Sequence, residues 1–166
     1  MNCLESKVCC EIKEICPKDH NDIAYYTQTI VNRELSIPEH KPPKEKILSK
    51  NYQICITKTK PIYIKLGCGK VTGCKLLVAG SISVGVEYSA AVPEQNVHYV
   101  HYDLPFHGLI MDEDCGRPIP KQDCDLNKFD LFVCTEHFQL DQINPRQLRL
   151  VVVLMLWLKR KHHCEC

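Results

Sequence analysis

The clearest pattern along the chain is an alternation of apolar and small or polar positions from residue 76 to residue 89. One parity carries the apolar set, which consists of Leu76, Val78, Gly80, Ile82, Val84, Val86 and Tyr88. Successive side chains of a β-strand point to opposite faces, so this period of two predicts a long strand with one buried face. Gly80 and Gly85 within the strand predict a bend or a bulge.

Weaker strand patterns lie on both sides of this segment. The other expected strands are residues 23–37, 47–58, 62–66, 97–106, 129–140 and 148–158. The last of them is apolar at both parities, which indicates a central strand covered on both faces. No stretch has a convincing helical period. We therefore predict an all-β fold, either an antiparallel β-sandwich or a flattened barrel.

Proline and glycine separate these strands. Residues 38–46 hold three prolines and five charged residues, which favours a linker or an extended edge outside the sheet interior. Residues 67–73 are glycine-rich and predict a turn. Pro105 is expected to close its strand, and residues 107–127, with prolines and consecutive acids, are expected to form a long loop.

Composition and charge narrow the class of protein. A chain of 166 residues is long enough for one domain with its own core. The formal net charge of +1 argues against nucleic acid or an acidic membrane as the main partner. The beginning of the chain lacks the pattern of a secretory signal, and the apolar run 148–158 is too short for a transmembrane helix. We therefore expect synthesis in a cytosol, where thiols stay reduced.

The chain has twelve cysteines, and six of them lie at its two ends. They divide it into a Cys-rich arm, residues 1–22, a β domain, residues 23–158, and a His/Cys-rich tail, residues 159–166. Because terminal segments add little to a core but can reach another molecule, we expect their cysteines to form disulfides between chains. These candidates are Cys3, Cys9, Cys10, Cys16, Cys164 and Cys166.

The internal cysteines suggest bonds within the chain. Cys68 and Cys74 flank the glycine-rich turn and are candidates for one bond, and Cys115 and Cys124 flank part of the long loop. Cys55 has the parity opposite to the inward residues Tyr52, Ile54 and Ile56, so we expect it to face outward. For Cys134 the sequence leaves two alternatives, a disulfide-bonded cysteine and a buried free cysteine.

Metal binding and catalysis are less well supported by the sequence. His162, His163, Cys164 and Cys166 are good zinc ligands by type, but their spacing departs from that of structural zinc sites. His98 and His101 have opposite parity and are expected on opposite faces of one strand. No nucleophile motif or phosphate-binding loop is present. We therefore predict no enzyme activity, no metal and no cofactor, with zinc as the alternative.

Two segments, LLVAGSISVGVEYSA and VPEQNVHYVHYDLPFHGLI, resemble the SPOCS domain of endospore-forming bacteria. The residues that carry the resemblance are Leu76, Val78, Gly80, Tyr88, Ala90, Val97, His98, Pro105 and Phe106. The similarity extends over roughly residues 35–158. The Cys9-Cys10 pair and its flanking arm are also similar in architecture to the connector of disulfide-linked endospore appendage pilins.

This resemblance implies a structural or protein-binding module of the spore coat, exosporium or spore morphogenesis, with no catalytic residues to carry over. Combined with the terminal cysteines, it predicts synthesis in the mother cell and assembly at the spore surface into a disulfide-linked fibre or lattice. The N-terminal arm is expected to dock on a neighbouring copy, and other coat proteins are candidate partners. The alternative function is a morphogenesis adaptor whose cysteines bind zinc.

Overall fold

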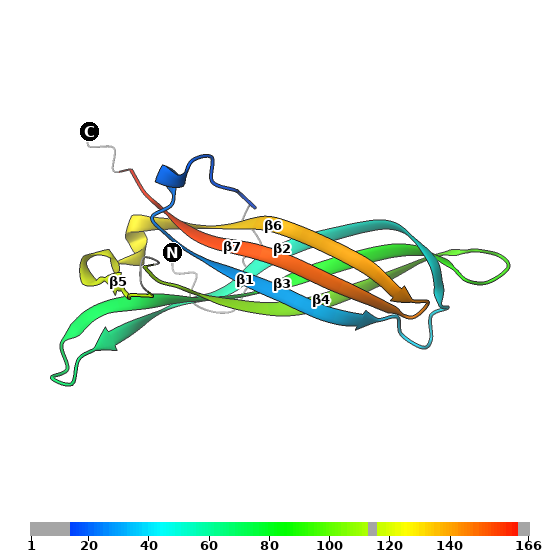
Figure 1. Cartoon of the computed structure of the whole chain (residues 1–166), viewed down its shortest axis with the longest axis horizontal. Helices are drawn as coiled ribbons and strands as arrows, with labels where there is room; N and C mark the ends of the chain where they lie inside the picture. The colour runs from blue at the N-terminus through cyan, green and yellow to red at the C-terminus, as the bar shows by residue number, and fades with distance from the viewer. Residues whose placement is uncertain (1–13, 113–115, 163–166) are drawn as a thin grey trace, which may run out of the picture.

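The chain folds as a sandwich of two antiparallel β-sheets, shown in Figure 1 by a computed structural model that describes residues 14–112 and 116–162. One sheet has the strand order β1-β7-β6, and the other has the order β2-β3-β4, with β5 paired to β3. The strands are β1 (Tyr25–Ser36), β2 (Lys44–Lys65), β3 (Val71–Ala90), β4 (Val97–Ile110), β5 (Ile119–Pro120), β6 (Phe129–Asn144) and β7 (Gln147–Arg160). Within the described residues the sheets do not close into a barrel, so of the two predicted forms the sandwich is correct.

Three short 3-10 helices in the described part of the chain lie at the end of the sandwich where β1 begins and β7 ends. They are η1 (His20–Asp22), η3 (Lys121–Asp123) and η4 (Leu126–Lys128). The pairing of Tyr25 with Leu158 places the start of the first strand beside the end of the last.

The alternation in β3 buries the predicted face. All seven residues of the apolar parity are buried, and Ile82, Val84 and Val86 have no exposed surface. β3 lies between β2 and β4, so both of its edges are hydrogen-bonded to neighbouring strands. The prediction of a long strand with one buried face is therefore confirmed.

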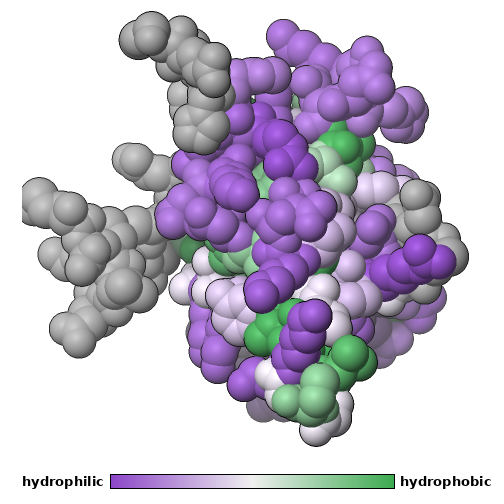
Figure 2. Space-filling view, turned by 90° about the vertical axis from the view of Figure 1, so that its left-hand side faces the viewer, coloured by the Kyte–Doolittle hydropathy of each residue, from purple (hydrophilic) through white to green (hydrophobic). Residues whose placement is uncertain are grey.

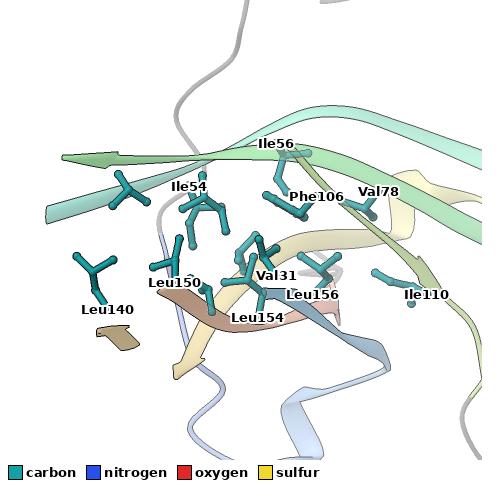
Figure 3. Close-up of a cluster of buried hydrophobic side chains, with 14 of the residues drawn as sticks. Val31, Ile54, Ile56, Val78, Phe106, Ile110, Leu140, Leu150, Leu154 and Leu156 are labelled. Atoms are coloured by element: carbon teal, nitrogen blue, oxygen red, sulfur yellow. The ribbon is translucent and has the colours of Figure 1, made fainter. Parts of the chain in front are cut away.

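The core lies between the two sheets, where side chains such as Ile54, Val78 and Phe106 meet Leu150 and Leu154 (Figure 3). β7 is the central strand of its sheet, as its apolar pattern predicts. Its even-numbered residues from Leu148 to Leu158 face this core. On the other face, Met155 and Trp157 pack with Cys134 in a second, smaller cluster.

The predicted irregularity lies in β2 opposite Gly80 rather than in β3 itself. β3 pairs with β4 without a register shift, whereas β2 has a shift between Ile56 and Lys58, opposite Gly80. Gly80 instead leaves room for the ring of Phe106, because a Cβ there would lie 2.6 Å from that ring and against the carbonyl oxygen of Cys55. The glycine thus permits an aromatic side chain to fill the core.

Two of the sequence predictions for strand ends are wrong. β2 begins at Lys44, inside the proline-rich segment 38–46, and passes through Pro61 without a break. β4 continues past Pro105 to Ile110, in the segment predicted as a loop. Both strands lie at edges of their sheet, where a proline can face outward and no hydrogen bond is lost.

Lys44 is buried, with 1% of its surface exposed, at the opposite end of the sandwich from η3 and η4. Its Nζ donates hydrogen bonds to the carbonyl oxygens of Asn144 and Gln147, in the β6–β7 hairpin. Burial lowers the pKa of this amine. Arg146 donates to the carbonyl oxygens of Pro38 and Lys41 at 3.4 and 3.1 Å. These bonds hold the crossover between the two sheets against the hairpin.

Candidate cross-linking and docking sites

Residues Glu14–Cys16, which we call the N-terminal strap, lie along strand β6. The Ile15 backbone N–H donates to the carbonyl oxygen of Val133 at 2.8 Å, and Trp157 Nε1 donates to the carbonyl oxygen of Ile15 at 2.9 Å. Cys16 forms a disulfide with Cys134, with 4.6 Å between their Cα atoms. β6 is an edge strand, so the strap covers part of an edge that would otherwise be open.

Glu14 connects the strap to both sheets. Its Oε1 accepts a hydrogen bond from the backbone N–H of Thr135 in β6 at 3.0 Å and one from the hydroxyl of Tyr52 in β2 at 3.4 Å. The Tyr52 ring stacks on Phe138 of β6, with ring centroids 4.5 Å apart. The strap therefore lies where the edges of the two sheets approach each other.

The expectation that Cys16 forms a disulfide between chains is wrong, because Cys16 is bonded within its own chain. The sequence separation of 118 residues hides the proximity of Cys16 to Cys134. Cys134 lies on the outer face of β6, next to the strap, and is not a free core cysteine. The part of the arm that the structure describes thus packs on its own sandwich.

A second disulfide joins Cys74 to Cys124, with 5.9 Å between their Cα atoms. Both cysteines are buried. The expected bond between Cys68 and Cys74 is therefore wrong. The residue opposite Cys74 in the hairpin is Tyr63, whereas Cys68 lies in the turn, three residues beyond the end of β2 at Lys65. The expected bond between Cys115 and Cys124 is also wrong, because Cys124 is bonded to Cys74. Cys115 itself lies outside the described residues.

The remaining cysteines differ in what the structure says of them. Cys55 lies on the face of β2 opposite Ile54 and Ile56, as predicted, and it is buried and disulfide-bonded. Cys68 is exposed and free. The other predicted interchain candidates lie outside the described residues, namely Cys3, Cys9, Cys10, Cys164 and Cys166.

A buried acid anchors η3 to the end of the sandwich. Asp123, 8% exposed, accepts two hydrogen bonds from Arg160, at 3.1 and 2.8 Å, and one from the hydroxyl of Tyr25 at 2.7 Å. The two bonds from Arg160, and after them the one bond from Tyr25, hold the pKa of Asp123 below its usual value, against the opposing effect of burial. Burial, followed by the bond to Asp123, raises the pKa of Tyr25. No pattern in the sequence predicts this cluster, because Tyr25, Asp123 and Arg160 lie far apart along the chain.

The histidines do not form a shared site. His98 stacks on the inward-facing Tyr88, with ring centroids 5.8 Å apart, whereas His101 lies on the outer face, 3.6 Å from Asp103. Their predicted placement on opposite faces is confirmed. Across residues 14–112 and 116–162, no three His, Cys, Asp or Glu side chains converge as a metal site would require. None of the helices in the described part is long and apolar enough to cross a membrane.

A groove of about 930 Å³ lies between the far part of the β2–β3 hairpin and the η3–η4 turns. Pro61, Tyr63 and Lys65 line it from β2, and Lys121 and Leu126 line it from the turns. Sequence analysis missed this groove because its two walls are about 60 residues apart in the chain. Figure 2 views this end of the molecule, where hydrophobic surface lies low in the view, among hydrophilic side chains.

Comparison with protein families identifies the class to which this sandwich belongs. The model of the family described as "SipL, SPOCS domain" matches residues 45–129, just over half of the chain. The chain belongs to the SPOCS-domain family. The matched part covers β2 to η4, which is the sheet that carries the projecting hairpin and the groove.

Membership gives the chain a spore-related role, in agreement with the sequence resemblance. Neither the curated proteins nor the solved structures contain a match to this chain.

Proposed function

We propose that this chain is a non-enzymatic structural protein of the spore surface whose copies are joined by disulfides into a fibre or lattice. The observation that carries the proposal is the exposed free thiol of Cys68 at the tip of the β2–β3 hairpin. The hairpin extends outward from the sandwich (Figure 1), so this thiol can meet another molecule without any rearrangement of the core.

The positions of the terminal cysteines support the same proposal. Cys164 and Cys166 follow Arg160, the last residue of β7, by four and six residues in the sequence. β7 ends at the end of the sandwich where β5 pairs with the hairpin base, since Arg160 contacts Asp123 of η3. β7 therefore ends at the end of the domain from which Cys68 projects, and the C-terminal cysteines follow it in the sequence.

The chemistry of joining fits a spore. Two thiols on different copies form one S–S bond and release two protons and two electrons to an oxidant such as dissolved dioxygen. In the mother-cell cytosol the thiols stay reduced, and lysis of that cell exposes them to oxidant. Other coat proteins with accessible thiols are candidate partners, and we propose no role in binding nucleic acid or membrane.

The test is electrophoresis of the purified chain after reduction and re-oxidation in air, in denaturant and without reductant. We expect a ladder of covalent oligomers that collapses to monomer with dithiothreitol. Cys68→Ser should shorten the ladder, and replacing Cys9 and Cys10 by Ser should leave assemblies that heat or acid takes apart. A single monomer band from the oxidised wild-type chain would contradict the proposal.

Electron microscopy of the oxidised sample then distinguishes a fibre from a lattice. The zinc-binding alternative is tested separately by metal analysis of the reduced protein. About one bound zinc ion per chain would favour the adaptor function over cross-linking, because zinc-bound thiolates are not available for disulfides.

A further inference from the structure

The β2–β3 hairpin extends well beyond the rest of its sheet. β3 pairs with β4 only as far as Leu76, whereas its pairing with β2 continues to Val71, opposite Lys65. A two-stranded ribbon is marginally stable alone. Here β5 pairs with β3 at Gly73 and Cys74, and the Cys74–Cys124 disulfide ties the hairpin to the segment between η3 and η4. The groove between them is therefore bounded by a covalently fixed wall.

The hairpin concentrates positive charge. Residues 57–75 contain five lysines and no acidic residue, although the whole chain has a net charge of only +1. Three lysines, Lys65, Lys70 and Lys121, line the groove, and Asp125 is the acid among the described residues that line it. None of the three lysines forms an ion pair in the described part of the chain. Their charge is thus available to a ligand.

Apolar residues line the groove together with these lysines. Tyr63 is 53% exposed, and Pro61, Val71 and Leu126 line the groove beside it. An exposed aromatic side chain next to aliphatic ones offers a contact for an apolar side chain of a partner. The groove therefore combines a contact surface for an apolar group with cationic groups.

Protection of the sheet edge does not explain this arrangement. Lysine and proline on an edge strand prevent pairing with other chains, and this accounts for Lys58, Lys60 and Pro61. It does not account for Lys70 in the turn or for Lys121 in η3, neither of which lies on the β2 edge. Nor does it explain why a half-exposed tyrosine lines the same groove.

We propose that this groove binds an extended acidic segment of another protein, with carboxylates near Lys65, Lys70 and Lys121 and an apolar side chain against Tyr63. Charge complementarity carries the choice of ligand. A peptide fits better than nucleic acid or another polyphosphate, because the described lining contains no arginine fork for phosphate and its aliphatic residues suit an apolar side chain. The proposal goes beyond cross-linking and does not require it.

The experiment measures binding of a fluorescein-labelled dodecapeptide of alternating Glu and Leu by fluorescence anisotropy, at 50 and 300 mM NaCl. All proteins are full-length chains carrying Cys68→Ser, so that cross-linking through the hairpin cannot contribute and failure of either proposal is seen separately. A triple variant, Lys65→Gln, Lys70→Gln and Lys121→Gln, removes the three lysine charges of the groove, and we call it the rim variant. The matched control replaces Lys18, Lys46 and Lys50 by Gln, which removes the same charge from exposed sites elsewhere.

We expect the rim variant to weaken binding at least tenfold at 50 mM NaCl and the control to weaken it less than threefold. Tyr63→Ser should weaken binding at both salt concentrations, because an apolar contact is not screened. Thermal unfolding followed by Trp157 fluorescence verifies that each variant is folded. No binding by the wild-type groove, equal loss in rim and control variants, or tighter binding of an oligonucleotide of equal charge would overturn the proposal.

Discussion

Replacing Asp123 by Asn should destabilise the domain and remove part of its sensitivity to acid. Asp123 is 8% exposed and accepts three hydrogen bonds, of which Arg160 donates two and Tyr25 one. An amide is neutral and has one acceptor oxygen, so it cannot replace both oxygens of the carboxylate. Hydrogen bonds to charged groups contribute about 1.5–3 kcal/mol each when they are shielded from water.

The expected loss is smaller than the sum of those bonds, because the Arg160 side chain is 53% exposed and its charge is partly screened. We expect Asp123→Asn to lower the free energy of unfolding by about 2 kcal/mol, with a fall in Tm of about 4–8 °C for a domain of this size. The effect should depend on pH. The folded pKa of Asp123 is lowered, so its contribution is present above the unfolded pKa of about 3.9 and is lost as the pH falls through the folded pKa.

The assay is urea unfolding at several pH values between 3 and 7, without reductant, followed by the fluorescence of Trp157, which is buried beneath the strap. Asp22→Asn is the control. Asp22 also accepts a hydrogen bond from a basic residue, Lys159 at 3.0 Å, which lowers its pKa, but it is much more exposed. We expect the control to change stability much less than Asp123→Asn does, in line with exposed pairs. Equal losses in the two variants would refute the argument that burial of Asp123 sets the magnitude.

Three further predictions follow from other contacts. Cys16→Ser, which removes a bond across 118 residues, should lower the free energy of unfolding without reductant by up to about 4–5 kcal/mol, and an unchanged urea midpoint would contradict this. Gly80→Ala should cost at least 1 kcal/mol more than Gly85→Ala, by the same assay, because the new Cβ at residue 80 meets a carbonyl oxygen and a core ring, whereas at residue 85 it meets the ends of two surface side chains. Burial raises the pKa of Tyr102 to about 12, so wild-type stability should fall between pH 10 and 12, and Tyr102→Phe should flatten that fall in alkaline unfolding curves.

The sequence allowed the sandwich to be predicted because two strands have unambiguous patterns. The alternation in β3 and the two-sided apolar run in β7 each reflect the central position of that strand in its sheet. The ends of β2 and β4 were harder to predict, since a proline reads as a break unless the strand is known to lie at an edge. Whether a strand lies at an edge is a property of the whole fold.

The two disulfide pairs that the structure describes could not be derived from spacing along the chain, because each joins segments that only the fold brings together. Parity nevertheless held a usable signal for one of them. Cys74 shares the parity of Leu76 and the other buried residues of β3, so its side chain points toward the core and away from a turn at the surface. This parity indicates a disulfide partner inside the domain, and Cys124 is that partner.

The central position of β7 has a consequence for synthesis of the protein. β1 and β6 each pair with β7 and not with each other, so their sheet cannot form until the last strand has left the ribosome. The β2–β3 and β3–β4 hairpins, by contrast, join neighbours in sequence and can form earlier on the nascent chain. Until β7 emerges, the apolar face of that first sheet remains uncovered, and we expect the growing polypeptide to depend on chaperones at this stage.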